Sequence, residues 1–213
     1  MSRRCRFLIL ALLFALAGCR TTIPGSGSLG DTLQAGKLLV HAEALKELDY
    51  TTIADRVPAS ERDQFSRSCI LRPGNRILLF GVQYTNQDLE PVKISQGQWK
   101  LELTPRAFEA YKPKLAERAA QAAAAGAGPV AKAASPSAVP LGLDSVIAEG
   151  GVDSYLFQYC PETRVEPSVR VGAKVTKDSR IAIPNVPADL TPSDLLLVFE
   201  DRTSGAVAKF ALQ

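Results

Sequence analysis

The run RILLFGVQYT, from Arg76 to Thr85, carries the strongest strand signal in this chain. It is rich in β-branched and aromatic residues and almost fully apolar on both faces, which is typical of a strand at the centre of a sheet. Turn signals lie on both sides of it, Arg72 to Asn75 before and Asn86 to Pro91 after. We therefore predict a β-sheet built around this strand.

Further short strands are predicted on both sides of this run. Lys37 to Leu48 allows either a helix or a strand, and we favour a strand because the rest of the chain is β-like. Val92 to Leu103 begins with alternating residues, which would place Trp99, Leu101 and Leu103 on one face. The later candidates, separated by turn signals such as Lys177-Asp178 and Pro184-Asn185, are 152–159, 169–176, 180–183, 195–200 and 206–212. Seven or eight strands at this spacing predict an all-β fold, an antiparallel β-sandwich.

An alanine-rich segment, from about residue 104 to 140, interrupts these strands. Phe108, Tyr111 and Leu115 lie at helical spacing, and the alanines support a helix while burying little apolar area. Pro113 limits the helix, and later glycines and prolines prevent it from continuing. We predict a partly helical surface insertion on which the core does not depend, with a partner-binding helix as the alternative.

The N-terminal segment has the pattern of an export signal. Three arginines lie within the first six residues, and eleven apolar residues follow from Phe7 to Ala17. A signal core has about 7–15 apolar residues, whereas a membrane-spanning helix needs roughly 20. The run ends in Leu16-Ala17-Gly18-Cys19, which resembles the lipobox of bacterial lipoproteins. The resemblance implies that residues 1–18 are a signal peptide and that Cys19 is lipidated. An ordinary signal or a short membrane anchor is the alternative.

The lipobox resemblance also implies a location. Arg20 follows the cysteine, where lipoproteins retained at the inner membrane carry Asp, so the resemblance implies a lipid anchor in the outer membrane, with the chain facing the periplasm or the surface. Residues 19–36 are rich in Gly, Ser and Thr, and this composition predicts a flexible tether. We expect one β-sandwich domain over residues 37–213, with the insertion at about 104–140.

The charge balance argues against nucleic acid as a partner. The chain has 25 basic and 22 acidic residues, and three of the basic residues lie in the signal, which leaves 22 of each. Binding to a phosphate backbone draws on an excess of positive charge, and the mature chain has none.

The four cysteines do not form one set. Cys5 lies in the signal and Cys19 in the lipobox, so Cys69 and Cys160 are left in a compartment that permits disulfides. We predict a bridge between them that ties the two sheets together, worth at most roughly 4–5 kcal/mol of unfolding free energy. A metal site is not expected, because the mature chain has one histidine, His41, and no methionine. We expect no other cofactor.

Enzymatic motifs are missing from the sequence. His41 is the one residue that could act as the base of a Ser-His-Asp triad, and no nucleophile elbow accompanies it. Asp and Glu are scattered singly, so no paired-carboxylate site is visible. Trp99, Tyr155 and Tyr159 could line a sugar-binding face, although strand aromatics of this kind usually belong to a core. We therefore expect that the protein is not an enzyme, and the alternative is an extracytoplasmic hydrolase whose carboxylate site the sequence does not reveal.

Over about residues 37–213 the chain resembles the immunoglobulin-like, telokin-like domain found in exported bacterial lipoproteins. The resemblance rests on three turn-and-strand signatures: Leu71 to Gly74 leading into Arg76–Asn86, Glu90-Pro91-Val92 with Trp99-Lys100-Leu101, and Ile183 to Leu190 with Leu195–Glu200. It implies an immunoglobulin-like sandwich used for extracytoplasmic binding or adhesion, with no catalytic residues. We therefore expect a non-catalytic binding or envelope-associated module, attached to the membrane by its lipid, with an envelope protein or a glycan as partner.

Overall fold

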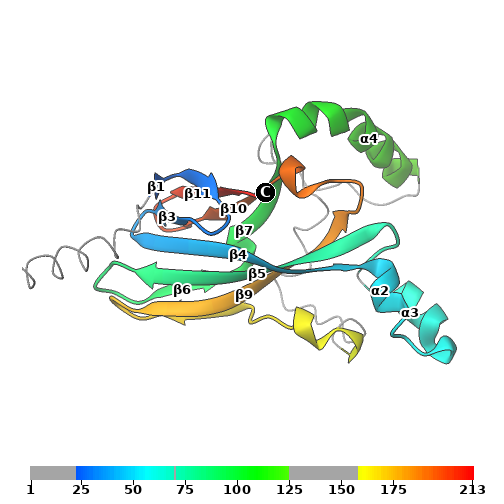
Figure 1. Ribbon diagram of the computed structural model, residues 1–213, viewed down its shortest axis with the longest axis horizontal. Coiled ribbons are helices and arrows are strands. Elements are labelled where there is room, and N and C mark those ends of the chain that lie inside the picture. The colour runs from blue at the N-terminus through cyan, green and yellow to red at the C-terminus, as the bar shows by residue number, and fades with distance from the viewer. Residues whose placement is uncertain (1–22, 70, 125–157) are drawn as a thin grey trace, which may run out of the picture.

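Three long antiparallel strands form the body of the larger of two main sheets (Figure 1). They are β4 (Leu38–Asp49), β5 (Asn75–Asn86) and β9 (Thr176–Pro187), and β3 (Thr32–Ala35) and β1 (Ile23–Pro24) extend the sheet beyond β4. β5 lies between β4 and β9, so the most apolar run of the sequence is an interior strand, as predicted. The computed structural model describes residues 23–69, 71–124 and 158–213.

The smaller main sheet has the strand order β2-β11-β10-β7. Its strands are β2 (Ser26–Ser28), β11 (Val207–Ala211), β10 (Leu195–Glu200) and β7 (Trp99–Leu103). A separate antiparallel pair joins β6 (Val92–Ser95) to β8 (Ser168–Val171). The pairings are antiparallel except for β1 with β3 and β2 with β11. The structure thus confirms the predicted all-β fold with the character of an antiparallel sandwich.

The two main sheets contribute to one large hydrophobic cluster, which we call the first core. Tyr84 from β5 meets Trp99 and Phe199 from the smaller sheet, and the ring centroids of Trp99 and Phe199 lie 5.0 Å apart. Trp99, Leu101 and Leu103 all belong to this cluster, which confirms that they share one face. The aromatic side chains of Trp99 and Tyr84 thus serve the core rather than a sugar-binding surface.

Glu102 departs from the expected alternation of β7, because it is buried although Lys100 beside it is half-exposed. Lys209 Nζ lies 2.8 Å from one Glu102 oxygen and Lys100 Nζ lies 3.2 Å from the other. Burial opposes the charged form, but the two ammonium groups hold the pKa of Glu102 below its ordinary value. The second face of the smaller sheet therefore carries a buried carboxylate whose charge is compensated.

A second hydrophobic cluster, the second core, lies on the opposite face of the larger sheet, toward one end of the long strands. Ile77 and Leu79 of β5 belong to it, whereas Leu78 and Phe80 point into the first core, as the alternation of a strand requires. Short helices cover it (Figure 1): α2 (Tyr50–Ala54), α3 (Arg62–Ser68) and the 3₁₀ turns η1 (Ala59–Glu61) and η3 (Pro161–Thr163). Beyond the second core, no described element covers that sheet face, and Glu43, Asp178 and Arg180 are exposed there.

Two β-bulges shift the pairing register of the long strands. Leu45 is an extra residue in β4, because Ala44 pairs with Phe80 and Lys46 already pairs with Leu79. In β9, Pro184 and Asn185 lie within the strand, and Asn185 has a φ of 58°. The turn predicted at Pro184-Asn185 is therefore wrong, because these residues make a bulge. The turn predicted at Lys177-Asp178 is also wrong, since both residues pair with β5, and β9 follows a turn that begins at Gly172.

The predicted tether at residues 19–36 is wrong in its second half. β3 pairs with β4, and its Leu33 and Ala35 side chains are fully buried in the first core. β2 adds Gly and Ser to the edge of β11, where Gly27 lies so close to Leu33 and Asp31 that a Cβ would clash. A segment with the composition of a linker thus forms strands at the sheet edges here, because its small residues allow other groups to approach the backbone closely.

The alanine-rich segment also differs from expectation where it is described. α4 spans Pro105–Ala124, and its first turns pack Ala107 and Tyr111 into the first core. The Tyr111 hydroxyl donates to Asp189 at 2.9 Å, and Lys114 pairs with the same carboxylate at 2.7 Å. The start of the insertion is therefore part of the core, because one helical face finds an apolar surface to cover. Residues 125–140 lie outside the described residues.

The strand predicted at 152–159 is not present in its described part, because Gln158 and Tyr159 are helical, and residues 152–157 lie outside the described residues. Strands 195–200 and 206–212 agree with β10 and β11. In the described part of the chain, the helices are too short or too polar to cross a membrane.

Candidate functional site

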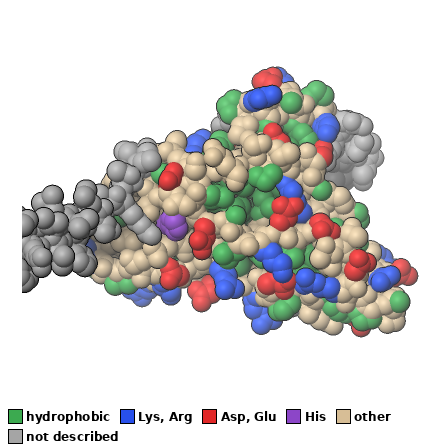
Figure 2. Space-filling model, viewed as in Figure 1, with side chains coloured by type: hydrophobic (Ala, Val, Ile, Leu, Met, Phe, Trp, Pro, Cys, Tyr) green, Lys and Arg blue, Asp and Glu red, His purple; other side chains and the backbone are tan. Residues whose placement is uncertain are grey.

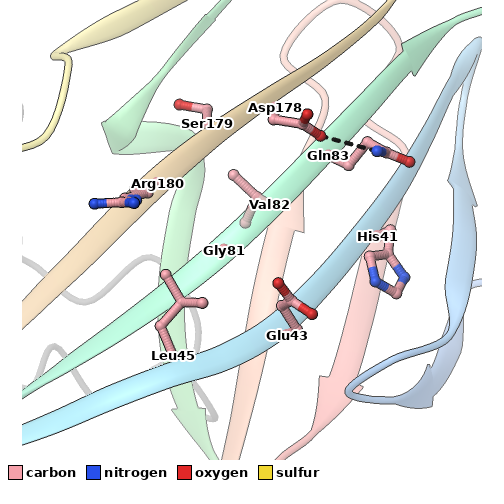
Figure 3. A pocket seen from close by; sticks show the side chains of 9 residues that line it. All are labelled: His41, Glu43, Leu45, Gly81, Val82, Gln83, Asp178, Ser179 and Arg180. Atoms are coloured by element: carbon pink, nitrogen blue, oxygen red, sulfur yellow. Dashed lines mark hydrogen bonds between the residues drawn. The ribbon is translucent and has the colours of Figure 1, made fainter.

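The solvent-facing part of the larger sheet carries polar side chains in two rows that cross β4, β5 and β9. The register places His41, Gln83 and Asp178 side by side in one row. The next row contains Glu43, Gly81 and Arg180 (Figure 3). Side chains of one row lie on the same face of a sheet at neighbouring positions. The six residues therefore form one surface site, although they come from three segments of the chain.

Gly81 makes this surface concave. The site encloses about 370 Å³ and is bordered on one side by Leu45. A Cβ built on Gly81 would lie 3.0 Å from the Glu43 carboxylate and 3.3 Å from Leu45, so even alanine would crowd the space. Glycine within a strand often marks a place where another group approaches the backbone closely. We call this site, formed by the two rows and Leu45, the Gly81 hollow.

His41 is held in a defined orientation at one side of the hollow. Its Nδ1 lies 3.0 Å from the carbonyl oxygen of Asp31. A carbonyl oxygen only accepts hydrogen bonds, so Nδ1 is the nitrogen that carries the proton. In the neutral ring, Nε2 is then left as a hydrogen-bond acceptor.

The other polar side chains present a mixed set of donors, acceptors and charges. Gln83 Nε2 donates to the Asp178 carboxylate at 2.8 Å, which fixes the amide and leaves its carbonyl oxygen as an acceptor. In the described residues, neither the Glu43 carboxylate nor the Arg180 guanidinium forms a hydrogen bond or ion pair. Opposite charges thus stand on either side of Gly81 without partners, available to a ligand.

The hollow contains one imidazole, from His41, and two carboxylates, from Glu43 and Asp178. No group of three or more histidine, cysteine or acidic side chains with the spacing of a metal site occurs among the described residues. His41, the one candidate base in the sequence, belongs to the hollow, whereas the other members were not expected to form a site. In the sequence, these strands are marked by polar residues at every second position: His41 and Glu43, Gln83 and Thr85, and Asp178 and Arg180.

The two cysteines predicted to form a disulfide lie elsewhere. Cys69 follows α3 and Cys160 precedes η3, and both are fully buried in the second core. The structure does not join them in its described part, so the bridge stays a prediction. A bridge at this place would connect the two helical segments rather than the two sheets, which corrects the expected role. Burial raises the pKa of the Cys160 thiol, although Arg56 lies 3.4 Å from its sulfur.

The remaining predicted residues fall in separate places. Tyr159 packs against Phe65 beside the second core and donates to Glu61, whereas Trp99 is buried in the first core. They therefore do not form one sugar-binding face. Tyr155 and the lipidation site Cys19 lie outside the described residues.

No protein-family model and no curated protein matches this chain. Among solved structures, the chain is similar to the yjhA protein from Bacillus subtilis at 8% sequence identity. The match covers 88% of this chain and 99% of that protein, with a TM-score of 0.42.

Proposed function

We propose that this protein is an exported, lipid-anchored and non-catalytic binding module, located at the outer membrane, which holds an envelope protein or a glycan at the Gly81 hollow. The lipobox that ends at Cys19 supports the export and the anchor. The balance of 22 basic and 22 acidic residues in the mature chain supports a partner other than nucleic acid.

The observation that carries the binding role is the construction of the hollow. Its side chains project from three paired strands rather than from a loop, so their positions are fixed by the sheet. The His41–Asp31 and Gln83–Asp178 hydrogen bonds orient two of them further. Preorganised polar groups around a concave surface are the usual features of a recognition site.

The hydrolase alternative would draw on Glu43 and Asp178, the two carboxylates of the hollow. They stand on β4 and β9, on either side of β5, and both are exposed. A carboxylic acid that donates a proton near neutral pH needs burial to keep it protonated, and catalytic sites usually exclude water. The open position of both carboxylates favours binding over hydrolysis.

A crosslinking experiment in intact cells tests the proposal. A photoreactive amino acid placed at Gln83 stands in the hollow, and the same group at the exposed Gln87 lies on the turn after β5. We expect a discrete crosslinked envelope component from position 83 and none from position 87. The expected adduct decreases when Arg180→Ala is added, because the guanidinium is one of the two unpartnered charges.

Two results would contradict the proposal. Identical adducts from positions 83 and 87 would show random collisions rather than a site. Turnover of a peptide, ester or glycan substrate that disappears in both Glu43→Gln and Asp178→Asn would establish the hydrolase instead.

A further inference from the structure

Within the described part of the chain, β4 has a free edge next to the Gly81 hollow. β3 pairs with β4 only from Leu38 to His41, and Gly30 adds one hydrogen bond to the Ala42 carbonyl at 2.8 Å. From Glu43 to Asp49, β4 pairs with β5 on one side, and no described residue pairs with its other side. Alternate residues of such an edge direct their N–H and C=O groups outward, where an added strand can bind them.

An apolar groove runs along the same edge, on the face of the sheet opposite the hollow. It encloses about 210 Å³. Ala44 to Glu47 form its rim, and its apolar walls are Leu29, Leu78, Phe80, Pro192 and Leu212. Figure 2 shows hydrophobic side chains gathered on the surface at the middle of the molecule, near the C-terminal end of the chain. We call this second cavity the edge groove.

The bulge at Leu45 joins the two cavities. Leu45 borders both the hollow and the edge groove, and 47% of its surface is exposed. Bulges and edge lysines commonly protect a free edge from pairing. Here the Lys46 ammonium is bound to Glu162 of η3 at 3.2 Å, so its charge is directed away from the edge, and an apolar side chain is left at the bulge.

We propose that the free edge of β4 binds an extended segment of a partner protein as an added strand. The side chains of such a strand alternate between the two faces. Those on one face reach the hollow, where the unpartnered Glu43 carboxylate selects a basic residue, and those on the other face fill the edge groove with apolar groups. The inference rests on the proposed binding function and narrows the partner from an envelope component to an extended, alternating basic and apolar peptide.

Hydrogen exchange of the backbone amides tests whether the edge is free. In the full chain solubilised in detergent, the outward-facing amides of residues 43–49 should exchange much faster than those paired with β5. Protection of all these amides in the free protein would overturn the inference, because a segment of the chain itself would then occupy the edge.

A selection from random seven-residue peptides displayed on phage tests the partner's chemistry. We expect enriched peptides with a basic residue flanked by apolar residues at alternating positions, which protect the amides of residues 43–49 on binding. Ala44→Glu places a charge in the edge groove and should weaken binding at least about tenfold, which corresponds to 1.4 kcal/mol. Its matched control, Ala59→Glu on the exposed surface of η1, should bind like the parent.

The charge preference has its own pair of variants. Glu43→Gln should weaken the selected peptides and remove the preference for a basic residue, whereas Glu109→Gln, on the exposed face of α4, should change neither. Peptides that bind Ala44→Glu as well as the parent, or a selection with no enrichment over bare beads, would overturn the inference. If position 83 still crosslinks to an envelope component in that case, the binding function stands and only strand addition is wrong.

Discussion

Tyr84 and Trp99 form a polar contact inside the first core. The Trp99 indole N–H donates to the Tyr84 hydroxyl at 2.7 Å, and both side chains are buried. Burial raises the pKa of the Tyr84 hydroxyl above its ordinary value, so this group stays neutral throughout the physiological range. The pair thus satisfies two polar groups in the apolar layer between β5 and β7.

Tyr84→Phe removes the acceptor and leaves the indole N–H without a partner in a buried place. We expect the free energy of unfolding to fall by about 1–3 kcal/mol, the usual loss for an unsatisfied buried donor. Tyr50→Phe is the control, because its hydroxyl meets Ser66 at the surface, and we expect a change within about 0.5 kcal/mol. Denaturant unfolding of the three proteins measures the difference, and equal losses for both variants would contradict the contact.

Gly81 and Gly27 offer a matched test of why the chain uses glycine within strands. A Cβ on Gly81 meets the mobile end of Glu43, which can move into solvent. A Cβ on Gly27 lies 2.9 Å from Leu33, which is fully buried and cannot move without disturbing the core. Gly81→Ala should therefore change the unfolding free energy by less than about 1 kcal/mol, whereas Gly27→Ala should cost about 1–3 kcal/mol. The opposite order in thermal unfolding would show that Gly81 serves stability rather than the hollow.

At the scale of elements, Glu162 connects η3 to the rest of the helical cover of the second core. Arg56 Nη1 lies 2.9 Å and Lys46 Nζ lies 3.2 Å from its carboxylate. The hydrogen bond from Arg56 is the main reason that the pKa of Glu162 falls to about 2.

This lowered pKa predicts a pH dependence. A carboxyl group with a lower pKa in the folded state contributes its stability above its unfolded pKa of 4.5 and loses it as the pH falls toward 2. Glu162→Gln should lower stability at pH 7 by about 1 kcal/mol, because the group is partly exposed and solvent weakens the pair. The difference from the parent should vanish near pH 2. Thermal midpoints compared from pH 7 to pH 2 measure the difference, with Glu166→Gln, at an exposed neighbour, as the control variant.

Cys69 and Cys160 of the second core give a further prediction. Both thiols lie in one buried cluster, and the resemblance of the N-terminal segment to an export signal predicts an oxidising compartment, so we expect a disulfide between them. Thiol labelling of the unfolded, unreduced protein should modify neither residue, and labelling after reduction should modify both. Two reactive thiols before reduction would refute the bridge.

The elements show which parts of the fold the sequence predicts. Leu195–Glu200 is predicted to the residue, since an apolar run between turn signals has one interpretation. Pro184-Asn185 has the composition of a turn, but β5 continues beside it and a bulge takes up the extra residue. Leu33 and Ala35 lie in a segment whose composition predicts a tether. They are buried because β3 pairs with β4, and local composition does not reveal that pairing. The Gly81 hollow depends on the register of three strands, so only its polar alternation is visible in the sequence.

At the scale of the whole molecule, part of the larger sheet is covered by packed elements and part of it is exposed. The smaller sheet fills one face of the long strands, and the helical cover protects one end of the other face. The described elements leave the Gly81 hollow and the neighbouring edge of β4 open. A module of this kind needs attachment near its partner, and the lipobox at the start of the chain would supply that attachment.

Cys19 offers the most direct test of whether this chain works as a lipid-anchored module. The intact mass of the protein extracted with detergent from the envelope should correspond to a chain that begins at Cys19 and carries acyl groups. Cys19→Ser should lose the acyl mass and leave an uncut precursor or a soluble form, while the outer-membrane fraction loses the protein. A wild-type protein whose mass shows no acyl groups, or that fractionates without the membrane, would contradict the lipid anchor and the membrane role that depends on it.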